Sequence, residues 1–365
     1  MNILDQQRIQ SHNSLLEKYH SPTSLFKTVR DTFTDNKNNH LVRYYRIGGF
    51  TIRLYFTGPA LIPHLTPALE HLSIEPHPLP DLTVFLWDSI STGMKGPNIP
   101  WKEEKHAAPG EIWSFNSKEF MIISQPERGT IHMLDKDANL AYYWVHDAAQ
   151  VPYHDQGAPL RIILNRWMMH RDRQLTHAAA VGLPQGGVLI AGRGGSGKST
   201  TALSCLDSEL LYAGDDYCLL ANHSVPRVFA LYNTGKLHSE DIEHFPFLRP
   251  AVSPAGQKEG EKTLFFFHRY LPQKMTPGFP VQAILIPHIT NRRESSLKRV
   301  SPARGFLALS PTTVYQLNAE EKRQANTMLS AFVRRVPNYL LELGTDCTRI
   351  PGLILDLLSC RSARG

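Results

Sequence analysis

The segment Gly192-Arg-Gly-Gly-Ser-Gly-Lys-Ser199 constrains the fold of this chain most strongly, because it satisfies the phosphate-loop pattern G-x-x-x-x-G-K-[ST]. The apolar run GGVLIAG precedes the segment, and STTALSCL, which favours a helix, follows it. This strand, loop and helix order is the context that the pattern requires. Glycines let the backbone wrap around phosphates with its N–H groups turned inward, and the start of the helix adds a positive dipole end. The sequence therefore predicts binding of a nucleoside triphosphate.

Two residues of this loop have specific expected roles. We expect Lys198 to contact the β- and γ-phosphates and the Ser199 hydroxyl to ligate Mg²⁺, so the expected cofactors are a nucleoside triphosphate, with the choice between ATP and GTP open, and Mg²⁺. The expected nucleotide-binding residues are Gly192, Arg193, Gly194, Gly195, Ser196, Gly197, Lys198, Ser199 and Thr200.

Downstream of the loop, LLYAGDDYCLL reads as an apolar strand that ends in Asp215 and Asp216. Two carboxylates at a strand end beside a phosphate loop can divide two tasks, since one can hold Mg²⁺ and the other can accept a proton from an attacking hydroxyl. Aspartate pairs are also common at strand-to-turn junctions without any catalytic role. The chain has no N/T-K-x-D guanine-reading motif and no LSGGQ-like transporter signature.

A histidine precedes the loop, in QLTHAAAVGLPQGGVLIAG. We expect the small-residue strand after His177 to pair with GGVLIAG in a hairpin, which would bring His177 to the sheet edge near the loop. Taken alone, a histidine in a strand is more often structural than functional.

The rest of the chain suggests three regions. We expect a mobile polar leader over 1–40, with one short helix around Ser14–Tyr19, and a small β-rich domain over 41–150. The expected strands of that domain are FTIRLYF, LTVFLW, EIWSF, FMIIS, TIHML and AYYWV. Strands and helices alternate over 151–365, which predicts an α/β catalytic domain with a mainly parallel sheet.

Charge and composition limit the classes of partner and ligand that we expect. The formal net charge of the 365 residues is +6, and the basic residues are scattered without a run interleaved with aromatics, so we expect no nucleic-acid partner. No apolar run approaches the ~18–20 residues of a membrane span, and no secretory signal is visible, so we expect no membrane partner and a cytoplasmic protein. The four cysteines lack C-x₂₋₄-C spacing, so we do not expect zinc.

Over about residues 175–220 the chain resembles the catalytic core of the HPr kinase/phosphorylase family. The resemblance is carried by three segments in this order: THAAAVG, GGVLIAGRGGSGKSTTAL and YAGDD. The resemblance implies an α/β P-loop kinase domain similar to HPr kinase and phosphoenolpyruvate carboxykinase, here preceded by the β-rich domain. It implies that Lys198 is the phosphate lysine, Asp216 the proton acceptor and His177 an active-site histidine. Ser199 and the neighbouring carboxylate of Asp215 are then the expected magnesium ligands.

The N-terminal half does not resemble that family's regulatory domain, so the chain looks more like the stand-alone HPr-kinase-like serine kinases, such as lasso-peptide precursor kinases. The implied reaction is transfer of the γ-phosphate of ATP to a serine of a peptide or small-protein partner. Phosphorylation of a small molecule such as free serine or a sugar, and a nucleotide switch or ATPase without acceptor, stay open, as does a homo-oligomeric state. Further candidates are Lys236 and Lys262 for phosphate or substrate, and Glu240 and Asp241, which lie near the position of the family's second magnesium ligand but in no motif.

Overall fold

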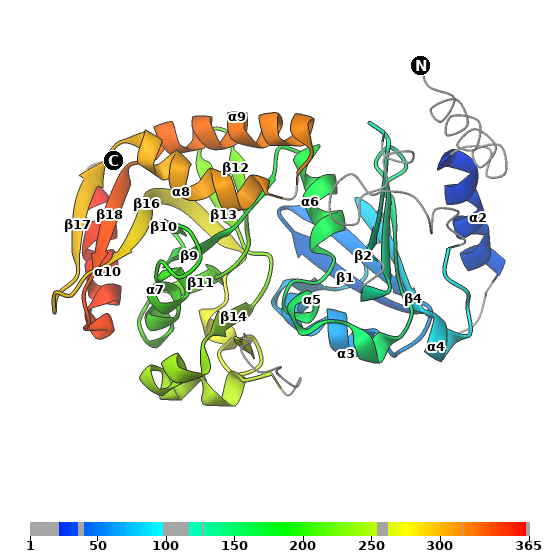
Figure 1. Cartoon of the computed structure of the whole chain (residues 1–365), viewed down its shortest axis with the longest axis horizontal. Coiled ribbons are helices and arrows are strands. Elements are labelled where there is room, and N and C mark those ends of the chain that lie inside the picture. The colour runs from blue at the N-terminus through cyan, green and yellow to red at the C-terminus, as the bar shows by residue number, and fades with distance from the viewer. Residues whose placement is uncertain are drawn as a thin grey trace, which may run out of the picture. The chain divides into compact units, whose positions relative to one another are not determined.

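The computed structural model describes residues 22–35, 40–97, 117–125, 128–253, 262–315 and 317–362. The fold is mixed α/β (Figure 1), and the chain divides into two compact units. Unit 1 comprises Met1–Arg43, Ile52–His64 and Pro78–Val151, and unit 2 comprises Tyr44–Thr51, Leu65–His77 and Pro152–Gly365. The helix expected around Ser14–Tyr19 and the strand expected at EIWSF lie outside the described residues.

Unit 1 is built on a sheet with the strand order β2-β4-β7-β6-β5. The elements wholly or mostly in this unit are α2 (Pro22–Asp35), β2 (Phe50–Phe56), α3 (Ile62–Leu65), β4 (Leu82–Asp88), α4 (Ser89–Thr92), β5 (Phe120–Gln125), β6 (Thr130–Asp135), β7 (Leu140–Val145) and the 3-10 helix η4 (Ala148–Gln150). The pairs β2–β4 and β4–β7 are parallel, whereas β7–β6 and β6–β5 are antiparallel. The strands expected at FTIRLYF, LTVFLW, FMIIS, TIHML and AYYWV are confirmed.

The helix α2 departs from the polar leader expected over 1–40. Its buried side chains are Leu25, Phe26, Val29 and Phe33, which share one face of the helix. The ring of Phe26 lies 4.9 Å from that of Phe120, and the ring of Phe33 lies 4.8 Å from that of Trp87. Polar residues outnumber apolar ones in this segment, but the helical spacing of the apolar residues is sufficient to anchor it in the core of unit 1.

Unit 2 carries the residues of the phosphate-loop region. Its elements are β1 (Leu41–Ile47), η1 (Pro67–Leu72), β3 (Ser73–Ile74), α5 (Tyr153–Gly157), α6 (Arg161–Met169), β8 (Gln174–Thr176), β9 (Ala178–Leu183), β10 (Gly186–Ala191), α7 (Lys198–Ser204), η5 (Cys205–Asp207), β11 (Leu211–Gly214), β12 (Cys218–Asn222), β13 (Pro226–Phe229), β14 (Thr234–Leu237), η6 (Ser239–His244), η7 (Pro246–Ala251), β15 (Thr263–Phe266), η8 (Pro272–Lys274), β16 (Gly278–Ile289), β17 (Ser296–Val300), α8 (Pro302–Val314), α9 (Ala319–Arg335), β18 (Asn338–Leu343), η9 (Cys347–Arg349) and α10 (Ile350–Ser362). The main sheet has the order β11-β9-β10-β16-β13-β12-β8, with β18 beside β16 and β17 beside β18, while β14 and β15 form a separate pair.

The expectation of a mainly parallel sheet is wrong. Among the described residues of this sheet, β10–β16 and β16–β18 are parallel, and the other pairs are antiparallel. The strand β11 does run in the direction of β10, as the strand–helix–strand alternation predicts, but β9 lies between them. A two-residue connection joins β9 to β10, and such short connections produce antiparallel hairpins. The hairpin predicted for the strand after His177 is thereby confirmed.

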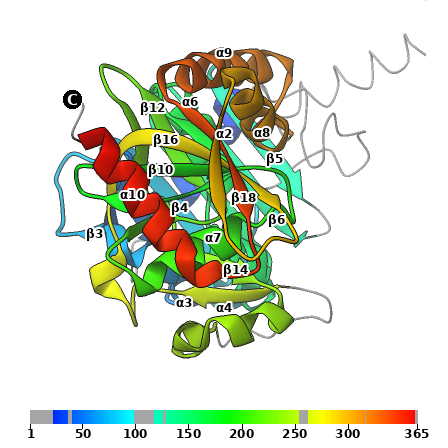
Figure 2. The same cartoon turned by 90° about the vertical axis from the view of Figure 1, so that its left-hand side faces the viewer.

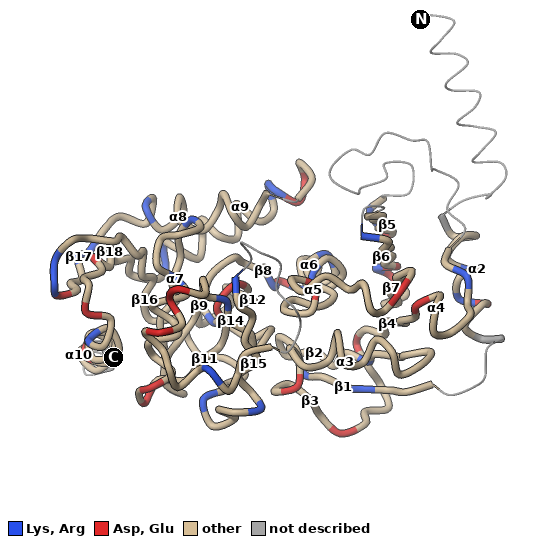
Figure 3. The backbone as a smooth tube through the Cα atoms, turned by 60° about the horizontal axis from the view of Figure 1, so that its bottom comes forward, with Lys and Arg blue, Asp and Glu red and all other residues tan. Residues whose placement is uncertain are grey.

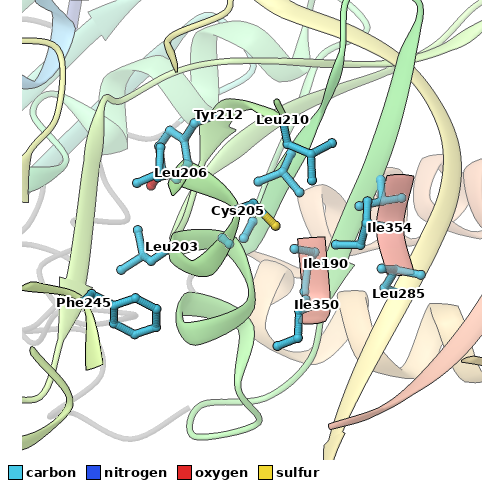
Figure 4. Packing of buried hydrophobic residues seen from close by; sticks show 14 of the residues in the cluster. Ile190, Leu203, Cys205, Leu206, Leu210, Tyr212, Phe245, Leu285, Ile350 and Ile354 are labelled. Carbon is cyan, nitrogen blue, oxygen red and sulfur yellow. The ribbon is translucent and has the colours of Figure 1, made fainter. Parts of the chain in front are cut away.

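The helices α7 and α10 pack on the central strands of unit 2 (Figures 2 and 4). Their apolar side chains form one hydrophobic cluster with those of the strands. It includes Ile190 of β10, Leu203 of α7, Leu285 of β16 and Ile354 of α10, all fully buried. Because both ends of the phosphate loop join these packed elements, the core fixes where the loop starts and where it ends.

The structure also shows how the basic residues are distributed and whether any described helix could cross a membrane. Along the described residues, Lys and Arg are spread over many elements and do not form one continuous basic stretch (Figure 3). None of the helices in the described part of the chain combines the length and the apolar character that crossing a membrane requires.

Candidate active site

The phosphate loop connects β10, which ends at Ala191, to α7, which begins at Lys198, so the predicted strand, loop and helix order is confirmed. The tip of the loop is exposed at Arg193, Gly194 and Gly195. A backbone hydrogen bond of 3.3 Å from the N–H of Ser196 to the carbonyl of Arg193 closes a turn within the loop. The loop thus presents its backbone to solvent while its two ends are held by the core.

Lys198 lies at the start of α7 and is 6% exposed. Its Nζ donates to the carbonyl oxygens of Gly192, at 2.8 Å, and of Arg193, at 3.1 Å. Burial lowers the pKa of Lys198, and the carboxylates of Asp215 and Asp216 oppose this shift. The ammonium group is thus bound by the loop's own carbonyl groups.

Gly197 is the loop position at which a side chain is least compatible with the structure. Its φ is +98°, and a Cβ there would lie 2.4 Å from Cδ1 of Leu343. At Gly194 a Cβ would meet no atom within 4 Å. We therefore expect Gly197→Ala to destabilise the chain by about 1–3 kcal/mol, and Gly194→Ala to leave the melting temperature unchanged.

Thermal unfolding of both variants without nucleotide measures this difference. Equal melting temperatures for the two variants would contradict the conformational requirement at Gly197.

Asp215 follows β11 and is almost completely buried. Its Oδ2 accepts a hydrogen bond of 3.2 Å from the backbone N–H of Lys236, and the nearby Ser199 side chain acts to lower the pKa of the carboxyl group. Among the described residues, its Oδ1 has no hydrogen-bond partner. Burial, reinforced by the charge of Asp216, raises the pKa of Asp215 to about 7.

Asp216 has a different environment. Its Oδ2 lies 3.0 Å from Nζ of Lys236, and its Oδ1 lies 3.9 Å from Nε2 of His177. Burial disfavours the ionised form, but the positive charge of Lys236 holds the pKa of Asp216 below its ordinary value. Neighbouring carboxyl groups with pKa values displaced in opposite directions are typical of sites that use one as a charged group and the other in a second role.

His177 lies between β8 and β9, at the end of the hairpin that leads into the loop. Its backbone N–H donates to Oγ1 of Thr313 at 3.3 Å, and its ring lies 5.6 Å from that of Tyr217. Burial and the nearby charge of Lys198 lower the pKa of His177 to about 4. The imidazole is therefore neutral at pH 7, and it faces Asp216 as a polar group and not as a cation.

The remaining sequence candidates divide into two groups. Lys236 contacts both aspartates, and the charge of Lys262, just before β15, acts on Lys198 and Asp216. Glu240 and Asp241 lie in η6, and no contact joins them to Ser199 or Asp215 among the described residues.

Two further side chains near the site carried no signal in the sequence. The guanidinium carbon of Arg161 lies 5.1 Å from the ring centre of Tyr217, and its charge contributes to lowering the pKa of His177. Tyr153 lies 5.9 Å from Nζ of Lys236. Both precede the loop by more than 30 positions in the sequence, and only the fold brings them to it.

The residues present fit a magnesium ion. Mg²⁺ is usually bound by one or two protein oxygens together with phosphate and water oxygens, and Ser199 and Asp215 offer a hydroxyl and a carboxylate next to each other. The buried Oδ1 of Asp215, which has no partner in the described structure, is available for such a bond. The described residues contain no group of three or more His, Cys, Asp or Glu side chains that could hold a metal ion.

Neither a protein-family model nor a curated protein sequence matches this chain.

Proposed function

We propose that this protein is an ATP- and Mg²⁺-dependent kinase that transfers the γ-phosphate to a serine hydroxyl of a peptide or small protein. The observation that supports it is the convergence of the loop lysine Lys198, the carboxylates Asp215 and Asp216, and His177 in one part of unit 2. A nucleotide-binding loop alone would serve many functions, whereas a half-buried carboxylate beside it provides a place for an acceptor hydroxyl. In this proposal unit 2 is a P-loop kinase domain of the kind that HPr kinase has.

The acceptor hydroxyl would lie in line with the γ-phosphorus and donate a hydrogen bond to Asp216. As the new bond between the acceptor oxygen and phosphorus forms, the bond from phosphorus to the β–γ bridging oxygen breaks and ADP leaves. The hydroxyl proton passes to Asp216, late in the reaction because the transition state is loose. Neutral His177, facing the other carboxylate oxygen, limits the positions that Asp216 can take.

Charge stabilisation is the larger part of this catalysis. Lys198 leaves the loop carbonyls and binds the phosphate oxygens, and the loop backbone surrounds them. Ser199 and Asp215 would hold Mg²⁺, which neutralises charge on the phosphates when bound.

The destination of the γ-phosphate tests the proposal. The purified protein is incubated with Mg²⁺, γ-labelled ATP and a desalted, size-fractionated lysate of the source organism, with Lys198→Ala and Asp216→Asn as controls. We expect label on serine in a peptide or protein fraction, and its loss with both variants. Label in the metabolite fraction would identify a small-molecule kinase, and release only as free phosphate, unchanged by Asp216→Asn, would identify a nucleotide switch.

A further inference from the structure

Lys236 connects the two carboxyl groups of the site. Its backbone N–H donates to Oδ2 of Asp215 at 3.2 Å, and its Nζ lies 3.0 Å from Oδ2 of Asp216. The side chain is 15% exposed, so the ion pair is mostly shielded from water. It is carried by β14, which pairs with β15 outside the main sheet of unit 2.

This ion pair competes with the role proposed for Asp216. An acceptor hydroxyl needs a carboxylate oxygen within hydrogen-bond distance. In the structure, Oδ2 of Asp216 is bound to Lys236, and Oδ1 faces His177 at 3.9 Å. While Lys236 stays there, Oδ2 of Asp216 is paired with the ammonium group, and this positive charge makes the carboxylate a weaker proton acceptor.

Two ammonium groups of the site are bound to protein oxygens. Lys198 is held by the carbonyls of Gly192 and Arg193, and Lys236 is held by Asp216. The terminal phosphate of ATP brings more negative charge to this place than ADP does, and a flexible lysine side chain can follow it.

We propose that Lys236 binds Asp216 while the γ-phosphate position is empty and binds the γ-phosphate when ATP arrives, which frees Asp216 for the acceptor hydroxyl. After transfer ADP leaves that position empty, and Lys236 returns to Asp216. The site would thus expose its proton acceptor only when a transferable phosphate is present. This inference rests on the proposed kinase function.

The ratio of the affinities for ATP and ADP reports whether Lys236 moves from Asp216 to the γ-phosphate, and it can be measured without any acceptor. Dissociation constants are measured by calorimetry for Mg²⁺ with a non-hydrolysable ATP analogue and with ADP. Four proteins are compared: the wild type, Lys236→Met, Asp216→Asn and the double variant Lys236→Met/Asp216→Asn. The double variant keeps the net charge of the wild type, so it separates contact with the γ-phosphate from simple neutralisation of Asp216.

We expect the double variant to bind the ATP analogue about tenfold more weakly than the wild type, and to bind ADP within about twofold of it, because one charge-assisted hydrogen bond is lost. Asp216→Asn alone should bind the ATP analogue as tightly as the wild type or several-fold more tightly, since its lysine is released in advance. Lys298→Met, which removes an exposed lysine of β17, should change neither constant.

The proposal is overturned if the double variant retains the wild-type preference for the ATP analogue, or loses affinity for both nucleotides equally. Binding of ADP itself reports that each variant is folded, and Lys236→Gln replaces Lys236→Met if the latter does not bind it. A protein that binds ATP but transfers phosphate to nothing would refute the kinase function and leave this measurement intact.

Discussion

Replacing Asp216 with asparagine is expected to lower the rate of phosphoryl transfer by roughly 10²–10⁴-fold without weakening the binding of MgATP. Asparagine has the shape of aspartate and keeps an acceptor oxygen, but its amide cannot take up the proton of the acceptor hydroxyl. Asp216 is half-buried and its carboxylate faces Lys236 and His177, and in the proposed mechanism it serves the acceptor hydroxyl. The loss should therefore appear in the chemical step.

Single-turnover transfer to the labelled acceptor fraction, together with the dissociation constant of MgATP, checks this expectation. His177→Gln serves as the comparison, because it removes a group that faces Asp216 and leaves the carboxylate in place. We expect it to reduce transfer less than Asp216→Asn does. Wild-type transfer by Asp216→Asn would exclude Asp216 as the proton acceptor.

Replacing Asp215 with asparagine is expected to stabilise the protein at pH 8 in the absence of metal and nucleotide, although it removes activity. The pKa of Asp215 is about 7, against an ordinary value of 3.8, because the carboxyl group is buried. As the pH rises from about 4 to about 7, the unfolded chain releases this proton while the folded chain keeps it, so stability falls over this range and is level above it. At 1.36 kcal/mol per pKa unit, the total reaches up to about 4 kcal/mol.

Asparagine cannot ionise, so the variant avoids this loss. Its oxygen can still accept the hydrogen bond from the backbone N–H of Lys236. We expect a melting temperature several degrees above that of the wild type at pH 8 in a chelator, and a difference close to zero at pH 4. Mg²⁺ should reduce the requirement for a proton on Asp215 in the wild type, because the metal stabilises the carboxylate.

Thermal unfolding of the two proteins across pH 4–8, with and without Mg²⁺ and ATP, makes the comparison. Asp215→Ser is the control for size and hydrogen bonding, since it also lacks an ionisable group. If the variant is less stable than the wild type at every pH, the carboxylate of Asp215 stabilises the fold. This would contradict the expectation that its ionisation lowers the stability of the metal-free protein.

Local sequence signals were sufficient to predict much of this site. The phosphate loop, the strand before it and the helix after it were predictable, because glycine spacing and apolar runs act over a few residues. The hairpin after His177 was also predictable, since two small-residue strands around a short polar turn have few other ways to pair.

Whether neighbouring strands of the sheet are parallel or antiparallel was not predictable from the same signals. Alternation of strands and helices reports that β10 and β11 run the same way, but it contains no information on which strand lies between them. The insertion of β9 between the two strands depends on non-local pairing, and it makes most of the sheet antiparallel.

The helix α2 shows a similar limit for composition. Its segment has the polar composition of a leader, yet Leu25, Phe26, Val29 and Phe33 share one face and are buried in unit 1. Composition averages over residues, whereas burial depends on the face that each side chain occupies.

The sequence by itself determined a phosphate loop, an aspartate pair at a strand end and a histidine ahead of them, since each depends on residues that are close along the chain. Only the tertiary structure decided how these groups differ. Lys236 comes from a separate pair of strands and binds Asp216, while burial raises the pKa of Asp215 to about 7 and lowers the pKa of His177 to about 4. Charge and solvation depend on distances between residues far apart in the sequence, so adjacent aspartates that look equivalent in the chain acquire different chemistry when it folds.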